Sequence, residues 1–129
     1  MQSRTGKIIV PPDANVWPHE METARALAKS GLIVEFIRRS EEQHVASADV
    51  LIDGVKWEMK APTSSSMKSL QRNLHKALHQ SPCVIIDSRR MKGVPDRAIE
   101  HELRMLSDKF KNLRRLKLVN RQRKVLDIK

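Results

Sequence analysis

Aromatic residues and cysteine are scarce in this chain. Its 129 residues include two tryptophans, two phenylalanines, no tyrosine and one cysteine, Cys83. With so few rings, we do not expect a ligand to be recognised by stacking on exposed aromatic side chains. A lone cysteine cannot form a disulfide within the chain, so the fold needs no oxidising compartment and is expected to work in a reducing one.

Long apolar runs are also missing. No stretch approaches the roughly 20 apolar residues of a membrane-spanning helix, and none forms a strongly hydrophobic amphipathic anchor. The start of the chain, from Met1 to Gly6, is polar and contains no signal-peptide core. We therefore expect no membrane partner, no signal peptide in this chain, and action in a cytoplasm.

Positive charge, by contrast, is in excess. Lysine and arginine number 25 against 15 acidic residues, so the formal net charge is +10. Such an excess favours a polyanionic partner, most simply a nucleic acid. Solubility alone, or attraction to an acidic protein, would also account for the charge. The 40% apolar content and the length predict one domain over residues 1–129.

Proline, glycine and serine divide the chain into short periodic segments. The elements expected are an apolar run at 8–10, a helix at 18–29, a strand at 32–37, a polar loop at 38–47, two strands around the Asp53-Gly54 turn, a helix at 66–79, a strand at 83–87, a helix after Pro95, and strands at 116–119 and 125–128. This order predicts an α/β (α+β) fold with an αβββαβ core. A mixed sheet is flanked by helices, and a C-terminal helix and a short hairpin follow.

Three charged residues on the predicted hairpin are the strongest candidates for a functional site. Asp-Gly between two apolar-alternating runs predicts a tight turn, and folding the hairpin back brings Asp49 near Glu58. Because strand side chains alternate between faces, Glu58 and Lys60 share one face. Two carboxylates and an ammonium at a sheet surface are suited to activating water against a phosphodiester. The alternative is a set of solvated charges on an edge hairpin.

Asp49 and Glu58 are also the candidate metal ligands. Their hard oxygens suit Mg²⁺ or Mn²⁺, which would acidify a bound water and stabilise charge on the phosphate. Lys60 would orient that water, accept its proton or contact the phosphate. Glu20 lies on the apolar side of the first predicted helix, with Ala24 and Leu27, and would complete the site through a metal-bound water.

The helix at 66–79 has a basic face. Lys68, Arg72 and Lys76 recur every four residues, a spacing that can follow a phosphate backbone. An ordinary solvated helix face is the alternative for the same pattern. Its position directly after the hairpin favours a role in nucleic-acid binding.

The motifs together resemble the PD-(D/E)XK nuclease superfamily. Ala48-Asp49 falls on the second core strand and Glu58-x-Lys60 on the third, although proline often precedes the first acid in that superfamily. More narrowly, the chain is similar to the tRNase-type C-terminal toxin domains of contact-dependent growth-inhibition (CdiA-like) and polymorphic toxin proteins. The resemblance covers roughly residues 18–87 and includes Lys76-x-x-x-Gln80.

The resemblance implies a metal-dependent endonuclease that acts on tRNA in the cytoplasm of a target cell after delivery. It implies a cognate immunity protein as a partner in the producing cell. The catalytic residues would be Asp49, Glu58 and Lys60, with Glu20 as an accessory acid. Lys76 and Gln80 would lie near the scissile phosphate.

Two other functions remain open from the residues. A DNA endonuclease of the same fold would use the same charged groups. A basic nucleic-acid-binding module without catalysis would use the carboxylates for structure alone.

Overall fold

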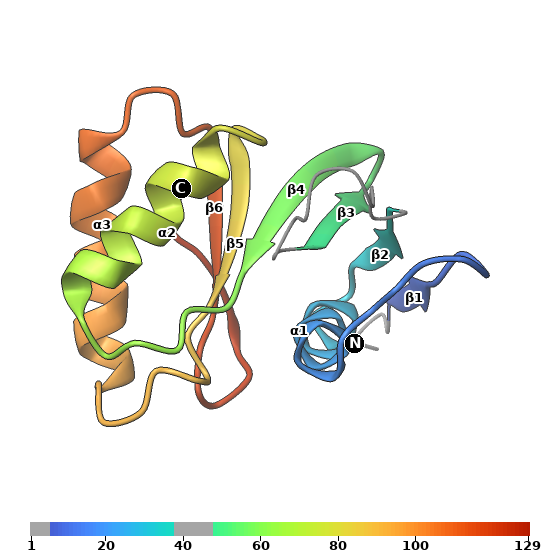
Figure 1. Cartoon of the computed structure of the whole chain (residues 1–129), viewed down its shortest axis with the longest axis horizontal. Helices are drawn as coiled ribbons and strands as arrows, with labels where there is room; N and C mark the ends of the chain where they lie inside the picture. Colours follow the sequence, from blue (N-terminus) through green and yellow to red (C-terminus); the bar gives the residue numbers. More distant parts are fainter. Residues whose placement is uncertain (1–5, 38–47) are drawn as a thin grey trace, which may run out of the picture.

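The chain folds into a curled seven-stranded mixed sheet with helices on its faces (Figure 1). The computed structural model describes residues 6–37 and 48–129. The elements are β1 (Lys7–Ile9), α1 (Pro18–Lys29), β2 (Ile33–Phe36), β3 (Ala48–Ile52), β4 (Val55–Lys60), α2 (Met67–Leu78), β5 (Cys83–Asp87), α3 (Asp96–Lys109), β6 (Arg115–Val119) and β7 (Val125–Asp127). The predicted fold class is confirmed, and the predicted element boundaries hold within about one residue. The loop predicted at 38–47 lies outside the described residues.

The strands follow one another across the sheet in chain order, from β1 to β7. β2, β3 and β4 form an antiparallel meander, whereas β4, β5 and β6 run parallel. β1 is parallel to β2, and β7 closes the other edge antiparallel to β6. The parallel step from β4 to β5 is made by α2, and the step from β5 to β6 is made by α3. Helical crossovers of this kind are the usual way to join parallel neighbours.

Two apolar clusters lie on opposite faces of the sheet. Val84 and Ile86 of β5 pack in the cluster under α2 and α3, while Cys83 and Ile85 pack in the cluster under α1. This alternation follows from the period-two geometry of a strand. β5 is buried along its whole length, as its run of apolar residues predicts. Figure 1 shows α2 and α3 side by side, with α1 set apart near β1 and β2.

Local sequence signals determine where α1 begins and ends. Pro18 occupies the first helical position, where its missing N–H costs nothing. Gly31 follows the helix with φ of +105°, a conformation that other residues rarely adopt. Glu20 and Leu27 are buried on one side of the helix, as the apolar spacing predicts.

Candidate active site

The hairpin of β3 and β4 places the three predicted catalytic residues together. Asp53 and Gly54 both have positive φ, +52° and +79°, as a two-residue hairpin turn requires. That turn pairs Ile52 with Val55 and, three residues further along each strand, Asp49 with Glu58. The predicted pairing of the two carboxylate residues is therefore confirmed. Lys60 lies two residues beyond Glu58, on the same face of β4.

These residues, here called the hairpin cluster (Asp49, Glu58 and Lys60), differ in their exposure to water. The Glu58 side chain is completely buried, whereas 16% of the Lys60 side chain and 25% of the Asp49 side chain are exposed. Lys60 Nζ lies 4.0 Å from Glu58 Oε1. Burying a carboxylate costs several kcal/mol unless a positive group stands nearby, and Lys60 is such a group.

Asp49 has a lysine neighbour of its own. Lys56 Nζ lies 3.4 Å from Asp49 Oδ2 across the hairpin. The other oxygen, Oδ1, is buried and accepts no hydrogen bond from the described residues. Buried polar oxygens in folded proteins nearly always have a partner. This oxygen of Asp49 is thus free to receive a ligand atom.

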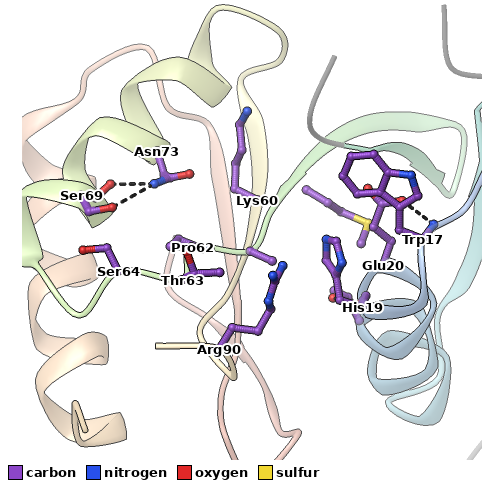
Figure 2. Close-up of a pocket in the computed structure, with 13 residues that line it drawn as sticks. Trp17, His19, Glu20, Lys60, Pro62, Thr63, Ser64, Ser69, Asn73 and Arg90 are labelled. Atoms are coloured by element: carbon purple, nitrogen blue, oxygen red, sulfur yellow. Dashed lines mark hydrogen bonds between the residues drawn. The ribbon is translucent and has the colours of Figure 1, made fainter. Parts of the chain in front are cut away.

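A pocket of about 470 Å³ opens where β4 ends (Figure 2). Its walls come from the start of α1, the end of β4, the segment that leads into α2, the first turns of α2 and the loop after β5. The lining residues are Trp17, His19, Glu20, Thr23, Met59, Lys60, Ala61, Pro62, Thr63, Ser64, Ser69, Asn73 and Arg90. Lys60 therefore connects the hairpin cluster to the pocket.

Glu20 reaches the same pocket from α1, and it also has a local structural role. Its side chain is buried, and Oε1 accepts a hydrogen bond of 2.9 Å from the backbone N–H of Trp17. An acid at the third helical position commonly caps the preceding backbone in this way. Glu20 and Lys60 line one cavity, while Asp49 and Glu58 do not contribute to its walls.

The predicted basic residues of α2 are exposed but do not line the pocket. Ser69 and Asn73 of the same helix line it instead, and sequence analysis did not single them out. Lys76 continues the spacing of Ser69 and Asn73 along α2, away from the pocket, and Gln80 follows the end of the helix. The exposed residues predicted to bind nucleic acid are Lys68, Arg72, Lys76 and Gln80.

A buried ion pair joins α1 to the end of β5, and it was also missed. Asp87 is almost completely buried, and its carboxylate accepts two bonds of 2.9 Å from Arg89 Nε. Thr23 donates its hydroxyl proton to the same carboxylate, and Arg89 also donates to the carbonyl oxygen of His19. The signal in the sequence was an aspartate that ends an otherwise apolar central strand.

Comparison with known proteins identifies the family. Residues 46–125 match the family model described as the contact-dependent growth inhibition CdiA C-terminal domain. The match spans more than half of the chain and includes the hairpin cluster, α2, β5 and α3. The chain belongs to this family. It is therefore a bacterial toxin domain of contact-dependent growth inhibition.

A solved structure shares the fold of this CdiA C-terminal domain. It comes from a CdiA-CT/CdiI toxin and immunity complex of Burkholderia pseudomallei, with a TM-score of 0.73. The alignment covers 96% of this chain and 99% of the other, at 16% identity. No protein among the curated sequences matches. No helix within the described part of the chain is long and apolar enough to cross a membrane.

The candidate metal ligands of the toxin domain are a pair of carboxylates, and they do not surround an ion completely. Within residues 6–37 and 48–129, no group of three or more His, Cys, Asp or Glu side chains is arranged to hold an ion. Mg²⁺ often binds through one or two carboxylates and keeps several waters. Asp49 and Glu58, with the unsatisfied Oδ1 of Asp49, fit that mode of binding. They do not fit zinc, which prefers nitrogen and sulfur ligands.

Proposed function

We propose that this domain is an endonuclease that cleaves tRNA in the cytoplasm of a target cell after delivery. The observation that supports it best is the hairpin cluster, with two facing carboxylates and a lysine that reaches a pocket. A phosphodiester needs positive charge around its oxygens and a positioned water, and these groups supply both. Membership in a family of toxin domains agrees with an activity that damages a cell.

Each residue of the cluster has a distinct role in this proposal. Asp49 and Glu58 would hold Mg²⁺ or Mn²⁺, which supplies an acidified water and neutralises charge on the phosphate. Lys60, partly exposed at the pocket, donates a hydrogen bond to a non-bridging phosphate oxygen or orients the attacking water. Glu20, at the opposite wall, acts as an accessory acid that orients water within the pocket.

The substrate surface is the exposed basic side of α2. Lys68, Arg72 and Lys76 face the solvent, on the helix that also forms one wall of the pocket. Contacts between these side chains and phosphates do not depend on base sequence, so they would follow the shape of a folded RNA. Gln80 would add a neutral hydrogen bond at the end of the same surface.

An immunity protein is the second proposed partner. The structural neighbour from Burkholderia pseudomallei was solved as a toxin and immunity complex, and its fold is shared by this domain. A producer of a nuclease needs a protein that binds and blocks it. The net charge of +10 favours an acidic surface on that partner.

Cleavage assays test the nuclease function directly. The wild type and the variants Glu58→Gln and Lys60→Ala are incubated with tRNA, plasmid DNA and single-stranded DNA, with Mg²⁺ or with EDTA. We expect tRNA cleavage by the wild type, a loss of at least about 100-fold in both variants, and inactivation by EDTA. Asp53→Asn is the matched control, because it removes a carboxylate from the turn of the same hairpin and preserves a residue that tolerates positive φ.

The outcomes separate the competing functions. Cleavage of DNA in preference to tRNA would identify a DNA endonuclease of the same fold. Binding without any cleavage would identify a non-catalytic module. Equal cleavage by the wild type, Glu58→Gln and Lys60→Ala would show that the hairpin cluster is not catalytic. Growth arrest on expression that is relieved by Glu58→Gln, but not by Asp53→Asn, would link the cluster to toxicity.

A further inference from the structure

We propose that the pocket binds one unpaired nucleotide of the RNA substrate, with its base stacked on Trp17 and its edge beside His19. This proposal rests on the nuclease function proposed above and adds a site for the base. The pocket volume of about 470 Å³ lies within the range of roughly 300–1,000 Å³ typical of small-molecule sites. One nucleotide is therefore a suitable occupant in size.

The first wall of the pocket is aromatic. The rings of Trp17 and His19 lie 5.7 Å apart between centroids and are tilted by 53°, and Trp17 is 39% exposed. Figure 2 shows both on the same side of the pocket, opposite Ser69 and Asn73. The chain has only four tryptophan and phenylalanine residues in total, and one of them, Trp17, is exposed and lines this cavity. The flat face of the Trp17 indole in that position is suited to the face of a base, with the tilted His19 ring beside it.

The backbone that carries this wall is hydrogen-bonded to side chains. The Trp17 N–H donates to the Glu20 carboxylate at 2.9 Å, and the His19 carbonyl accepts a hydrogen bond from Arg89 Nη2 at 3.2 Å. The start of α1 is thus held in place while the exposed Trp17 ring faces the pocket. Substituting the Trp17 side chain leaves its backbone hydrogen bond in place, so the wall can be altered without uncapping α1.

The opposite wall presents an oriented amide. Asn73 Nδ2 donates to the Ser69 carbonyl at 2.8 Å and to Ser69 Oγ at 3.4 Å. Because the Ser69 carbonyl oxygen can only accept a hydrogen bond, the amide atom of Asn73 that faces it is the nitrogen. Figure 2 shows the Asn73 oxygen directed away from Ser69. Such an oxygen accepts an N–H from the edge of a base, and in a duplex the pairing N–H groups are already engaged.

Two cationic side chains of the pocket would contact the phosphate of the same nucleotide. Lys60 and Arg90 both line the pocket, between the aromatic wall and the amide wall (Figure 2). Arg90 is exposed and follows β5 in the loop that carries Arg89. A nucleotide with its base on Trp17 and its phosphate near Lys60 would present the backbone to the hairpin cluster. The pocket would thus select an unpaired position and align its phosphodiester.

The test measures binding of a single-stranded adenosine hexaribonucleotide in the Glu58→Gln background. Trp57→Phe removes the buried tryptophan and leaves Trp17 as the reporter of intrinsic fluorescence. We expect saturable quenching by the hexanucleotide and none by an abasic ribose-phosphate hexamer. Trp17→Phe, which keeps Trp57, is the matched reporter control and should show no quenching.

Affinities of an end-labelled hexanucleotide give a second readout that does not depend on Trp57→Phe folding correctly. Trp17→Ala should weaken binding about tenfold, Asn73→Ala a few-fold, and Trp17→Phe about threefold or less.

Equal affinity of wild type and Trp17→Ala, or equal binding of the abasic hexamer, would overturn the proposal. Cleavage of tRNA that is unchanged in Trp17→Ala would reject the base site and leave the nuclease function standing. Saturable quenching by the hexanucleotide together with no tRNA cleavage by the wild type would reject the nuclease function and leave the base site standing.

Discussion

At the scale of single residues, Glu58 is a carboxylate buried away from water. Its carboxylate is completely buried, and Lys60 Nζ lies 4.0 Å from its Oε1. Moving a charged group out of water costs several kcal/mol, and a contact of this length returns a small part of that cost. Active sites commonly retain such groups at the expense of stability.

Glu58→Gln is expected to preserve or raise the melting temperature. Glutamine has the same shape, and it removes the buried charge, while the partly exposed Lys60 ammonium can still reach water. Lys60→Met should lower the melting temperature, because it removes a cation from beside the buried Glu58 charge. Thermal unfolding followed by circular dichroism measures both. A loss of more than about 2 kcal/mol in Glu58→Gln would show that the carboxylate supports the fold.

At the scale of elements, the Asp87–Arg89 ion pair links α1 to β5. Arg89 contacts the carboxylate of Asp87, the hydroxyl of Thr23 and the carbonyl of His19. The bonds to Thr23 and His19 join residues 66 and 70 positions apart, and they tie the first turns of α1 to the end of β5. The aromatic wall and Glu20 belong to those turns. The ion pair consequently helps to hold the α1 wall of the pocket in place.

Arg89→Met is expected to destabilise the domain by about 3–5 kcal/mol, because it leaves the buried Asp87 carboxylate without its cation. Arg90→Met is the matched control, since the next residue in the chain is an exposed arginine and should change stability by about 0.5 kcal/mol or less. Urea unfolding curves of the two variants give the comparison. Equal stability would mean that Asp87 finds other partners when Arg89 is removed.

The start of α2 depends on one serine. The Ser66 side chain accepts hydrogen bonds from the backbone N–H groups of Lys68 and Ser69. Ser66→Ala should cost about 1 kcal/mol and lower the melting temperature by about 3–5 °C. Thr63→Ala, at an exposed position of the same segment, should have little effect. Calorimetry distinguishes the two, and equal melting temperatures would show that water replaces the cap.

For the whole molecule, the position of the positive charge matters as well as its amount. In the Glu58→Gln background, three neutral substitutions on α2 should weaken tRNA binding and reduce the slope of log K against log salt by about 2 to 3. An equal loss of charge elsewhere should change the slope much less. The first set is Lys68→Gln, Arg72→Gln and Lys76→Gln; the control set is Lys7→Gln, Lys29→Gln and Lys124→Gln.

Filter-binding titrations between about 50 and 200 mM salt measure the slopes. Equal slopes for the two sets would show that the charge attracts RNA diffusely and that α2 is not the docking surface. Both sets consist of exposed side chains, so neither should affect folding.

Most of the fold was predictable because its signals are local. α1 and β5 match their predicted boundaries, since Pro18 and Gly31 punctuate the first and an unbroken apolar run defines the second. The hairpin cluster was predictable for the same reason. Asp53-Gly54 determines the turn, the turn determines the register, and the register places Asp49 opposite Glu58. The family match agrees with the resemblance read from these motifs.

The pocket was not predictable in this way. Trp17, Asn73 and Arg90 come from three separate segments, and no local spacing relates them. The scarcity of aromatic rings argued against stacking, yet the count of rings says nothing about where one of them lies. Arg89 was also missed, because its partners Thr23 and His19 lie far away in the chain.

The sequence alone determined the elements, their order and the pairing of the two carboxylates, because periodicity and turn chemistry act over a few residues. Only the tertiary structure decided that Glu58 is fully buried, that Lys60 reaches a cavity, and that the first turns of α1 and α2 face each other across it. Those properties arise when the two faces of one curled sheet are covered by different helices. They depend on packing between distant segments, which no short stretch of the chain encodes.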